Sequence, residues 1–135
     1  MLTPAERLEE ILKLLDKLED ISADTPIVVE GRRDVEAFKR MGIARNVVSI
    51  GKGLSIFTFC ENISREHAEV VVMTDWDRKG GRLARSLKEA FEANGVKVND
   101  RLRAQLVMLS KKEVKDIESM PTFIGRLRTL ANRQD

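Results

Sequence analysis

Three acidic residues stand directly after short apolar segments of the chain. Glu30 follows residues 27–29, and Asp75 and Asp77 follow the apolar run that begins at residue 70. Aspartates two residues apart project to the same side of an extended segment, so both can face one cation. Mg²⁺ prefers oxygen ligands and typically takes one or two carboxylates while it keeps waters and substrate phosphates. The pattern predicts a Mg²⁺ site formed by Asp75, Asp77 and Glu30.

Helix capping is the alternative interpretation of the same acids. Glu30 would cap a helix that follows Gly31, and Asp75 and Asp77 would cap a helix that follows Gly81. Capping accounts comfortably for one acid. Several like charges converging on one edge require a cation or a raised pKa, so we prefer the metal site.

Basic side chains accompany these acids along the chain. The residues expected to bind phosphate are Arg32, Arg33, Lys52, Arg78, Lys79 and Arg82. Further positive charge lies in the last third of the chain, at Lys111, Lys112, Arg126, Arg128 and Arg133. Such clusters favour contact with a nucleic-acid backbone rather than readout of bases. A solvated face is the other interpretation, because Arg85 and Glu89 stand at the spacing of an ordinary helical ion pair.

Glycines mark the turns near the same positions. The glycines expected to be structural are Gly31, Gly51, Gly53 and Gly80. Gly51 and Gly53 flank Lys52, so the backbone amides and the lysine are placed to hold a phosphate. A tight turn explains both glycines equally well, and the spacing is not that of a P-loop.

Three other side chains are of types that can bind a ligand or a metal. Trp76, between the two aspartates, either stacks on a base or packs on a neighbouring helix, and we prefer packing. His67 has no second histidine with which to share a zinc ion. Cys60 lies in an apolar stretch and has no partner for an internal disulfide, so we expect inert burial. Residues 115–118 also follow a predicted strand, and we assign them no role.

A parallel sheet would bring the acids together. Short β-branched runs predict strands at 26–30, 46–50, 70–74 and about 104–109, and helical spacing between and after them predicts helices at 33–41, 54–65, 82–94 and 121–131. Ligands bind at the carboxyl ends of such strands. If Glu30 shares a site with the aspartates, the first and third strands must be neighbours. We therefore expect an α/β fold with a four-stranded parallel sheet in the order 2-1-3-4 and helices on both faces.

An extra amphipathic helix is predicted before the first strand. Thr3, Pro4 and Glu6 form a capping box with proline in the first turn, and apolar residues then recur at three- and four-residue steps. We assign residues 1–24 to this accessory helix and residues 25–135 to a single domain. The apolar stripe packs on its own domain in the preferred interpretation. A homodimer or a protein partner is the alternative.

Composition limits the class of protein. The chain has 135 residues, of which 42% are apolar and 34% charged, which suits one ordinary domain and excludes a two-domain enzyme. Apolar runs are too short for a membrane span, and the acidic start of the chain is unlike a secretory signal, so we expect a cytoplasmic protein. Residues 1–30 carry a net charge of −5 and the remainder +7, which favours a polyanionic partner.

The residues that follow the first and third predicted strands resemble the Toprim domain family of topoisomerases, bacterial-type primases, recombination-repair proteins and several nucleases. Glu30 and Gly31, within residues 29–35, match the hallmark Glu-Gly, and Asp75 and Asp77 match the hallmark Asp-x-Asp. The resemblance covers about residues 25–120 and implies a Rossmann-like Toprim fold. It also implies that Glu30 acts as general acid or base in phosphodiester chemistry and that the aspartates hold Mg²⁺. Mn²⁺ is the alternative cation.

The sequence departs from the Toprim pattern in two respects, and both limit the functions that the resemblance implies. Lys79 stands where many topoisomerase-type members have a third acid, and the chain has no tyrosine, which excludes strand passage through a tyrosyl phosphodiester. Primase action would need a larger body. The chain looks more similar to the ribosomal-RNA maturation nucleases and to small archaeal and bacterial Toprim proteins. We expect a Mg²⁺-dependent nuclease or RNA-processing factor, with RNA as the preferred substrate and DNA as the alternative.

Two other functions remain open from the sequence. The first is a non-catalytic nucleic-acid-binding or assembly module, in which the acidic cluster holds a structural cation; the small size of the chain and Lys79 favour it. The second is hydrolysis of a nucleotide or another small phosphate ester.

Overall fold

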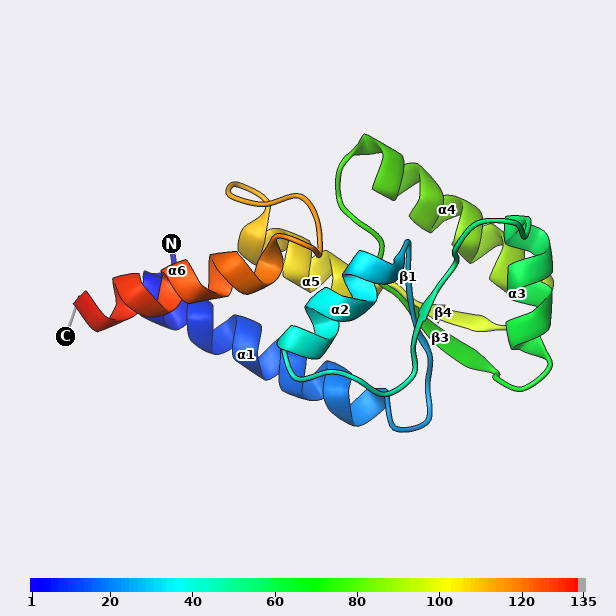
Figure 1. Ribbon diagram of the computed structural model, residues 1–135, viewed down its shortest axis with the longest axis horizontal. Helices are drawn as coiled ribbons and strands as arrows, with labels where there is room; N and C mark the ends of the chain where they lie inside the picture. Colours follow the sequence, from blue (N-terminus) through cyan, green and yellow to red (C-terminus); the bar gives the residue numbers. More distant parts are fainter. Residues whose placement is uncertain (134–135) are drawn as a thin grey trace.

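Short strands and longer helices alternate through most of the chain (Figure 1). The computed structural model describes residues 1–133. The strands are β1 (Ile27–Val29), β2 (Val47–Ser49), β3 (Glu69–Val72) and β4 (Lys97–Asn99). The helices are α1 (Pro4–Ile21), α2 (Arg32–Arg40), α3 (Ile56–Ser64), α4 (Arg78–Ala93), α5 (Arg101–Ser110) and α6 (Met120–Arg133).

The strands form one parallel sheet in the order β2-β1-β3-β4. Val28 of β1 pairs with Val48 of β2 on one side and with Val72 of β3 on the other. The predicted α/β fold and strand order are therefore confirmed. Because β1 and β3 are neighbours, the residues that follow them meet at the same edge of the sheet.

Alternating strand residues supply two separate cores, one on each face of the sheet. Val28, Val70 and Val72 pack with α3 and α4, where Phe59 and Phe91 meet edge to face with ring centres 6.3 Å apart. The opposite face is covered by helices α1, α2, α5 and α6. Its buried strand residues are Ile27, Val29, Val71 and Met73. The continuously apolar strands are thus explained by burial on both faces.

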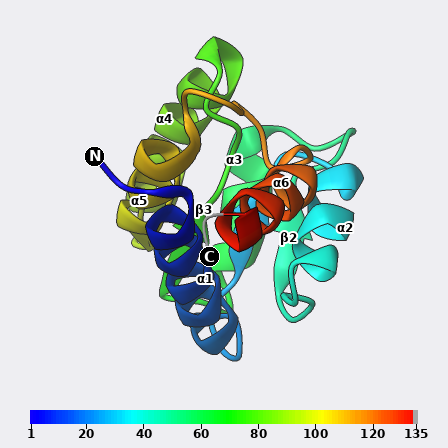
Figure 2. The same ribbon diagram turned by 90° about the vertical axis from the view of Figure 1, so that its left-hand side faces the viewer.

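Helix α1 begins and packs as its sequence predicts. The Glu6 amide donates to the Thr3 hydroxyl (3.1 Å), and the Thr3 amide donates to Glu6 Oε1 (2.9 Å). The apolar stripe of α1 is buried against α5 and α6, which lie beside it in both ribbon views (Figures 1 and 2). The stripe therefore packs within the chain. Judged by length and hydropathy, no helix within residues 1–133 could span a membrane.

The fourth strand was expected at 104–109, and this prediction is wrong. Those residues belong to α5, in which Leu102, Leu106 and Ser110 are buried at helical spacing while Met108 is 77% exposed. A short apolar run does not by itself distinguish a strand from a helix. The actual β4 is an edge strand with an exposed Lys97, so it lacks the continuous apolar pattern of the inner strands.

Helix α4 begins earlier than the predicted residue 82, because Asp77 caps it. The Gly80 amide donates to Asp77 Oδ1 (2.7 Å), so the first turn contains both Gly80 and Gly81. The Thr74 hydroxyl, buried after β3, donates to the Gly80 carbonyl (2.8 Å). A Cβ at Gly80 would overlap the Asp75 carbonyl group, whereas a Cβ at Gly81 would meet nothing within 4 Å. Gly80 thus allows α4 to approach the end of β3.

This difference predicts opposite effects for two neighbouring substitutions. Gly80→Ala should lower the free energy of unfolding by about 1–3 kcal/mol, because the new methyl group forces the backbone of Asp75 aside. Gly81→Ala is the matched control and should raise it by about 0.5–1 kcal/mol, because alanine favours the helix. Urea unfolding measures both, and equal effects would contradict the close approach at Gly80.

Candidate functional site

Glu30 and Asp75 meet at the carboxyl ends of β1 and β3. The backbone amide of Asp75 donates a hydrogen bond to Glu30 Oε1 (3.2 Å). Both side chains are half-buried. The contact joins residues 45 positions apart in sequence, and it exists because β1 and β3 are adjacent in the sheet. Two of the predicted site carboxylates therefore lie together.

Asp77 does not take part in the contact between Glu30 and Asp75. Its Oδ1 atom accepts the Gly80 amide and caps α4, as the capping interpretation proposed for this residue, and its side chain is exposed. Glu30 does not cap α2; the Asp34 side chain accepts the Gly31 amide instead (3.0 Å). Within residues 1–133, no group of three or more histidine, cysteine, aspartate or glutamate side chains is close enough to enclose a metal ion.

Two further acids lie close to Asp75, and the sequence analysis had assigned them no role. Asp34, from the first turn of α2, is only 7% exposed. Asp116 comes from the connection between α5 and α6, and its Oδ1 accepts the Ser119 amide (2.7 Å). The position of Asp34 could have been predicted from the local sequence, because this residue occupies the capping-box position three residues after Gly31. Asp116 follows the apolar run at residues 104–109, but this run belongs to α5 and not to a strand, so only the folding of its loop brings Asp116 near Asp75.

Among the acids of this cluster, Asp75 has a strongly raised pKa. Burial raises the pKa of Asp75 from its usual 3.8 to about 7, and the like charges of Asp34, Glu30 and Asp116 add to the rise. The Ile117 amide donates to Asp75 Oδ1 (2.9 Å) and partly opposes this shift. Burial also raises the pKa of Asp34. Burial is therefore the main cause of both shifts, and the neighbouring acids add to it.

The loop between α5 and α6 also covers Trp76. The Trp76 amide donates to the Lys115 carbonyl (2.8 Å), and its indole Nε1 donates to the Val114 carbonyl (2.7 Å). The side chain is half-buried against the core on the α1 face of the sheet. Trp76 therefore packs, as the preferred interpretation expected.

Arg103 of α5 holds the backbone of the same strand end. Its Nε donates to the Thr74 carbonyl (2.9 Å), and its Nη2 donates to the Asp75 carbonyl (2.6 Å). Burial lowers the pKa of the Arg103 guanidinium, and nearby carboxylates, first that of Asp75, oppose this shift. The sequence analysis missed Arg103, because the expected strand at 104–109 would have placed it elsewhere.

The predicted phosphate-binding cations are all exposed. Arg32 and Arg33 lie in the first turn of α2, and Arg78, Lys79 and Arg82 lie in the first turns of α4. Within residues 1–133, Arg33 alone among them forms a salt bridge, at 3.8 Å to Glu118. The first turns of helices that follow parallel strands lie at the carboxyl edge, so these cations lie at the same edge of the sheet as the acids.

Lys52 lies at the same edge, beyond β2. Gly51 and Gly53, on either side of it, have φ values of +70° and +102°, so this turn depends on glycine. The Gly51 amide lies 3.5 Å from the Glu30 carbonyl. The turn that carries Lys52 is therefore adjacent to Glu30. Gly31 has an extended backbone and open space around its Cβ position, so its conformation does not require glycine.

The donor set suits a hard cation. Asp75 and Asp77 each use Oδ1 to accept a backbone amide, and within residues 1–133 the Oδ2 atom of each accepts no hydrogen bond. Mg²⁺ takes one or two carboxylates beside its waters, so the free oxygen of Asp75 or of Asp77 is a ligand of the right chemical type.

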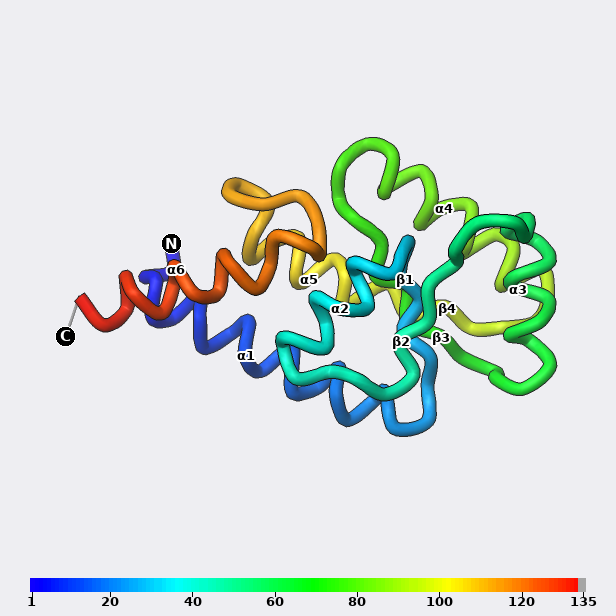
Figure 3. The backbone as a smooth tube through the Cα atoms, viewed as in Figure 1, coloured from blue at the N-terminus to red at the C-terminus, as the bar shows by residue number. Residues whose placement is uncertain are grey.

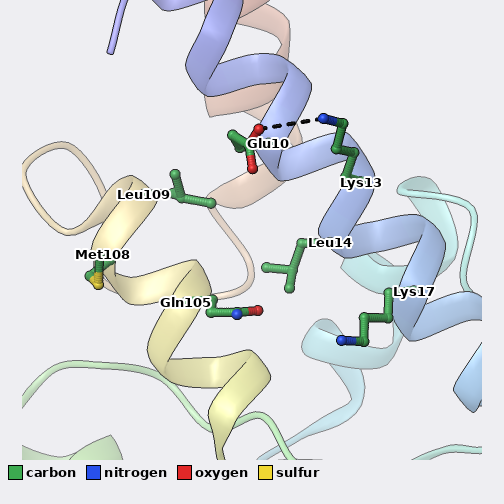
Figure 4. Close-up of a pocket in the computed structure, with 7 residues that line it drawn as sticks. All are labelled: Glu10, Lys13, Leu14, Lys17, Gln105, Met108 and Leu109. Carbon is green, nitrogen blue, oxygen red and sulfur yellow. Dashed lines mark ion pairs between the residues drawn. The ribbon is translucent and has the colours of Figure 1, made fainter. Parts of the chain in front are cut away.

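A groove elsewhere on the molecule does not coincide with this cluster. It lies between α1 and α5, has a volume of about 270 Å³, and includes the ion pair of Lys13 with Glu10 (3.5 Å; Figure 4). None of the clustered carboxylates lines it. Cys60 is also apart from the acids. It is fully buried, which confirms the expected burial, and burial raises the pKa of its thiol to about 11.

The raised pKa of Asp75 predicts a pH-dependent stability in the absence of metal. A carboxyl whose pKa is raised by folding destabilises the folded protein as pH rises from about 4 to about 7, and this cost persists above pH 7. Asp75→Asn should therefore raise the free energy of unfolding at pH 8 in chelator, on the order of 1–2 kcal/mol, and much less at pH 4. Urea unfolding at both pH values measures the difference, with the exposed Asp16→Asn as control. An equal effect of Asp75→Asn at both pH values would contradict the shift.

Comparison with known proteins places the chain in a family. A family model described as the Toprim domain matches residues 25–109. A UPF0292 protein from Methanosarcina barkeri is 43% identical over 124 residues, which cover 91% of this chain and 86% of that protein. A UPF0292 protein from Methanocaldococcus jannaschii is 31% identical over 122 residues, which cover 90% of this chain and 94% of that protein. A solved structure, a putative protein from Aquifex aeolicus, shares the fold with a TM-score of 0.69 at 23% identity, covering 79% of this chain and 94% of its own. The chain belongs to the Toprim domain family.

Proposed function

We propose that this protein is a Mg²⁺-dependent nuclease that hydrolyses phosphodiester bonds of nucleic acid, with RNA preferred over DNA. Membership of the Toprim family supports the coarser statement, a metal-dependent role on nucleic acid. The observation that supports the proposal most directly is the contact between Glu30 and the Asp75 amide, within a rim of exposed cations. We expect the protein to act in the cytoplasm, through a Toprim domain of residues 25–135 with α1 as an accessory helix.

Each part of the chemistry has candidate residues in this chain. Phosphodiester hydrolysis requires neutralised phosphate charge, a positioned water and a group that takes its proton. Mg²⁺ held by the free oxygens of Asp75 and Asp77, with Glu30 adjacent, would supply charge neutralisation at the phosphate. The second carboxylate oxygen of Glu30 accepts no hydrogen bond within residues 1–133, so it is available to orient the water or accept its proton.

Exposed cations would supply the remaining part of the proposed chemistry. Lys52, Arg78 and Lys79 are exposed at the same edge, where they can offset charge that develops on the phosphate. Lys79 stands in place of the third acid of many family members and points to weaker metal binding or to direct contact with phosphate. Arg103 and the Ile117 amide hold the Asp75 backbone and side chain, so this part of the site is positioned before substrate arrives.

Substitution of the acids tests the proposal. Asp75→Asn combined with Asp77→Asn should abolish metal-dependent cleavage, and Glu30→Gln should lower the rate roughly 10²- to 10⁴-fold, because it removes the proton acceptor. Labelled structured RNA and single- and double-stranded DNA serve as substrates, with Mg²⁺, Mn²⁺ or chelator. Calorimetric titration of Mg²⁺ provides a readout that is independent of cleavage, and the double variant should also lose this binding.

The control is Glu36→Gln, an exposed acid on α2 outside the cluster, which should cleave as the unmodified protein does. Cleavage that survives chelator, or an unchanged cleavage rate in Glu30→Gln, would overturn the nuclease proposal. Nucleic-acid binding that is unchanged by Glu30→Gln, without cleavage by any of the proteins, would instead identify a non-catalytic binding module.

A further inference from the structure

Phe57, in the first turn of α3, is an unusual surface residue of this protein. Its exposed fraction is 55%, and the neighbouring Leu54 is 51% exposed. Within residues 1–133, no other phenylalanine is exposed, and Trp76 is half-buried and hydrogen-bonded through its indole nitrogen. The structure therefore offers one open aromatic face to a ligand.

Packing of the chain does not account for Phe57. The face of α3 that contacts the core consists of Ile56, Phe59, Cys60 and Ile63. Residue 57 lies off this apolar stripe, at a position where an amphipathic helix normally carries a polar side chain. Single exposed apolar residues are common on protein surfaces, but Phe57 follows exposed Leu54 by three residues and exposed Lys52 by five, so apolar surface and positive charge occur together here.

The location of Phe57 connects it to the acidic cluster. The chain leaves β2, passes beside β1 and enters α3, as the backbone tube shows (Figure 3). In this connection the Ile50 amide donates to the Val29 carbonyl (3.1 Å), and the next amide, of Gly51, approaches the Glu30 carbonyl. Since α3 follows a parallel strand, its first turn lies at the carboxyl edge of the sheet. Phe57 and Glu30 are thus at the same edge.

Charge at this edge favours a polyanion as the ligand. Lys52, between Gly51 and Leu54, is exposed and forms no salt bridge within residues 1–133. Arg32, Arg78 and Lys79 are exposed in the first turns of α2 and α4. A nucleotide combines an apolar π-face with a phosphate, which matches an aromatic ring beside a lysine.

We propose that Phe57, together with Leu54 and Lys52, binds an unpaired nucleotide of the nucleic-acid substrate next to the acidic cluster. This inference rests on the proposed function and adds a substrate class to it. The base stacks on the Phe57 ring, Leu54 contacts its edge, and Lys52 neutralises the adjoining phosphate. Bases inside a duplex are already stacked on their neighbours, so the site selects single-stranded or looped nucleic acid over a continuous duplex.

Binding in chelator tests this inference without cleavage. Fluorescence anisotropy with a labelled oligouridine RNA, the corresponding single-stranded DNA and a blunt RNA duplex gives the affinities. Phe57→Ala should weaken binding of the single-stranded probes roughly 5- to 100-fold, the range expected for loss of one base–aromatic stack. Duplex binding should stay within about twofold, because phosphate contacts dominate it.

Three matched variants separate stacking from other effects. Phe57→Trp should retain single-strand binding, because it keeps a π-face, and Phe57→Leu should lose it, because leucine keeps only the apolar surface. Leu130→Ala, an exposed apolar residue on α6, should bind all probes as the unmodified protein does. Thermal unfolding confirms that each variant is folded.

The outcomes distinguish this inference from the proposed nuclease activity. Cleavage by the unmodified protein with unchanged single-strand affinity in Phe57→Ala overturns the stacking site and leaves the nuclease intact. Selective loss of single-strand binding in Phe57→Ala, without cleavage by the unmodified protein in Mg²⁺, supports the site and overturns the nuclease. Equal losses for single strands and duplex, or full affinity in Phe57→Leu, overturn the stacking site. Absence of binding to every probe in chelator overturns the stacking site, and the cleavage assay in Mg²⁺ then decides the nuclease proposal by itself.

Discussion

Carboxylates of like charge are held together at the ends of two adjacent parallel strands, and the surrounding structure must supply the contacts that allow it. The Asp75 amide binds Glu30, the Ile117 amide binds the Asp75 carboxylate, and Arg103 binds the carbonyls of Thr74 and Asp75. Backbone donors and a guanidinium thus offset part of the repulsion. Burial, together with the like charges of neighbouring acids, still raises the pKa of Asp75 to about 7. An uptake of positive charge at this point, whether by a proton or by a cation, would stabilise the folded protein.

Helices from both ends of the chain support this strand end. Helix α1 packs against α5 and α6, α5 supplies Arg103, and the loop between α5 and α6 supplies the contacts to Asp75 and Trp76. Helix α4 approaches from the other side, which only glycine at position 80 allows. The Toprim match ends at residue 109, yet part of the support for Asp75 comes from residues 114–117. The site therefore depends on packing outside the region that defines the family.

The acids and the cations differ in burial. Glu30, Asp34 and Asp75 are half-buried or buried and joined to backbone groups, whereas Arg32, Arg78, Lys79 and Lys52 are exposed. The positions of the acids are therefore set by packing and hydrogen bonds within the chain, while the cations face solvent. Lys79 extends the cationic rim at the position where an acid would have added to the cluster.

Local pattern in the sequence indicated three of the four strands and most helices, because burial on both faces produces continuous apolar strands. The strand order followed from the expectation that Glu30 shares a site with the acids after β3. Local pattern also determined the cap of α1 and the burial of Cys60. Strand β4 was misplaced, since a short apolar run such as residues 104–109 fits a helix as well as a strand. The cap of α4 by Asp77 spans only three residues, and the structure confirms the capping interpretation that the sequence offered for this residue. Only the tertiary structure decided that Arg103 and the Ile117 amide hold Asp75, and that exposed Phe57 lies at the same edge of the sheet as Glu30. Those relations join residues distant in sequence, and no local spacing encodes them.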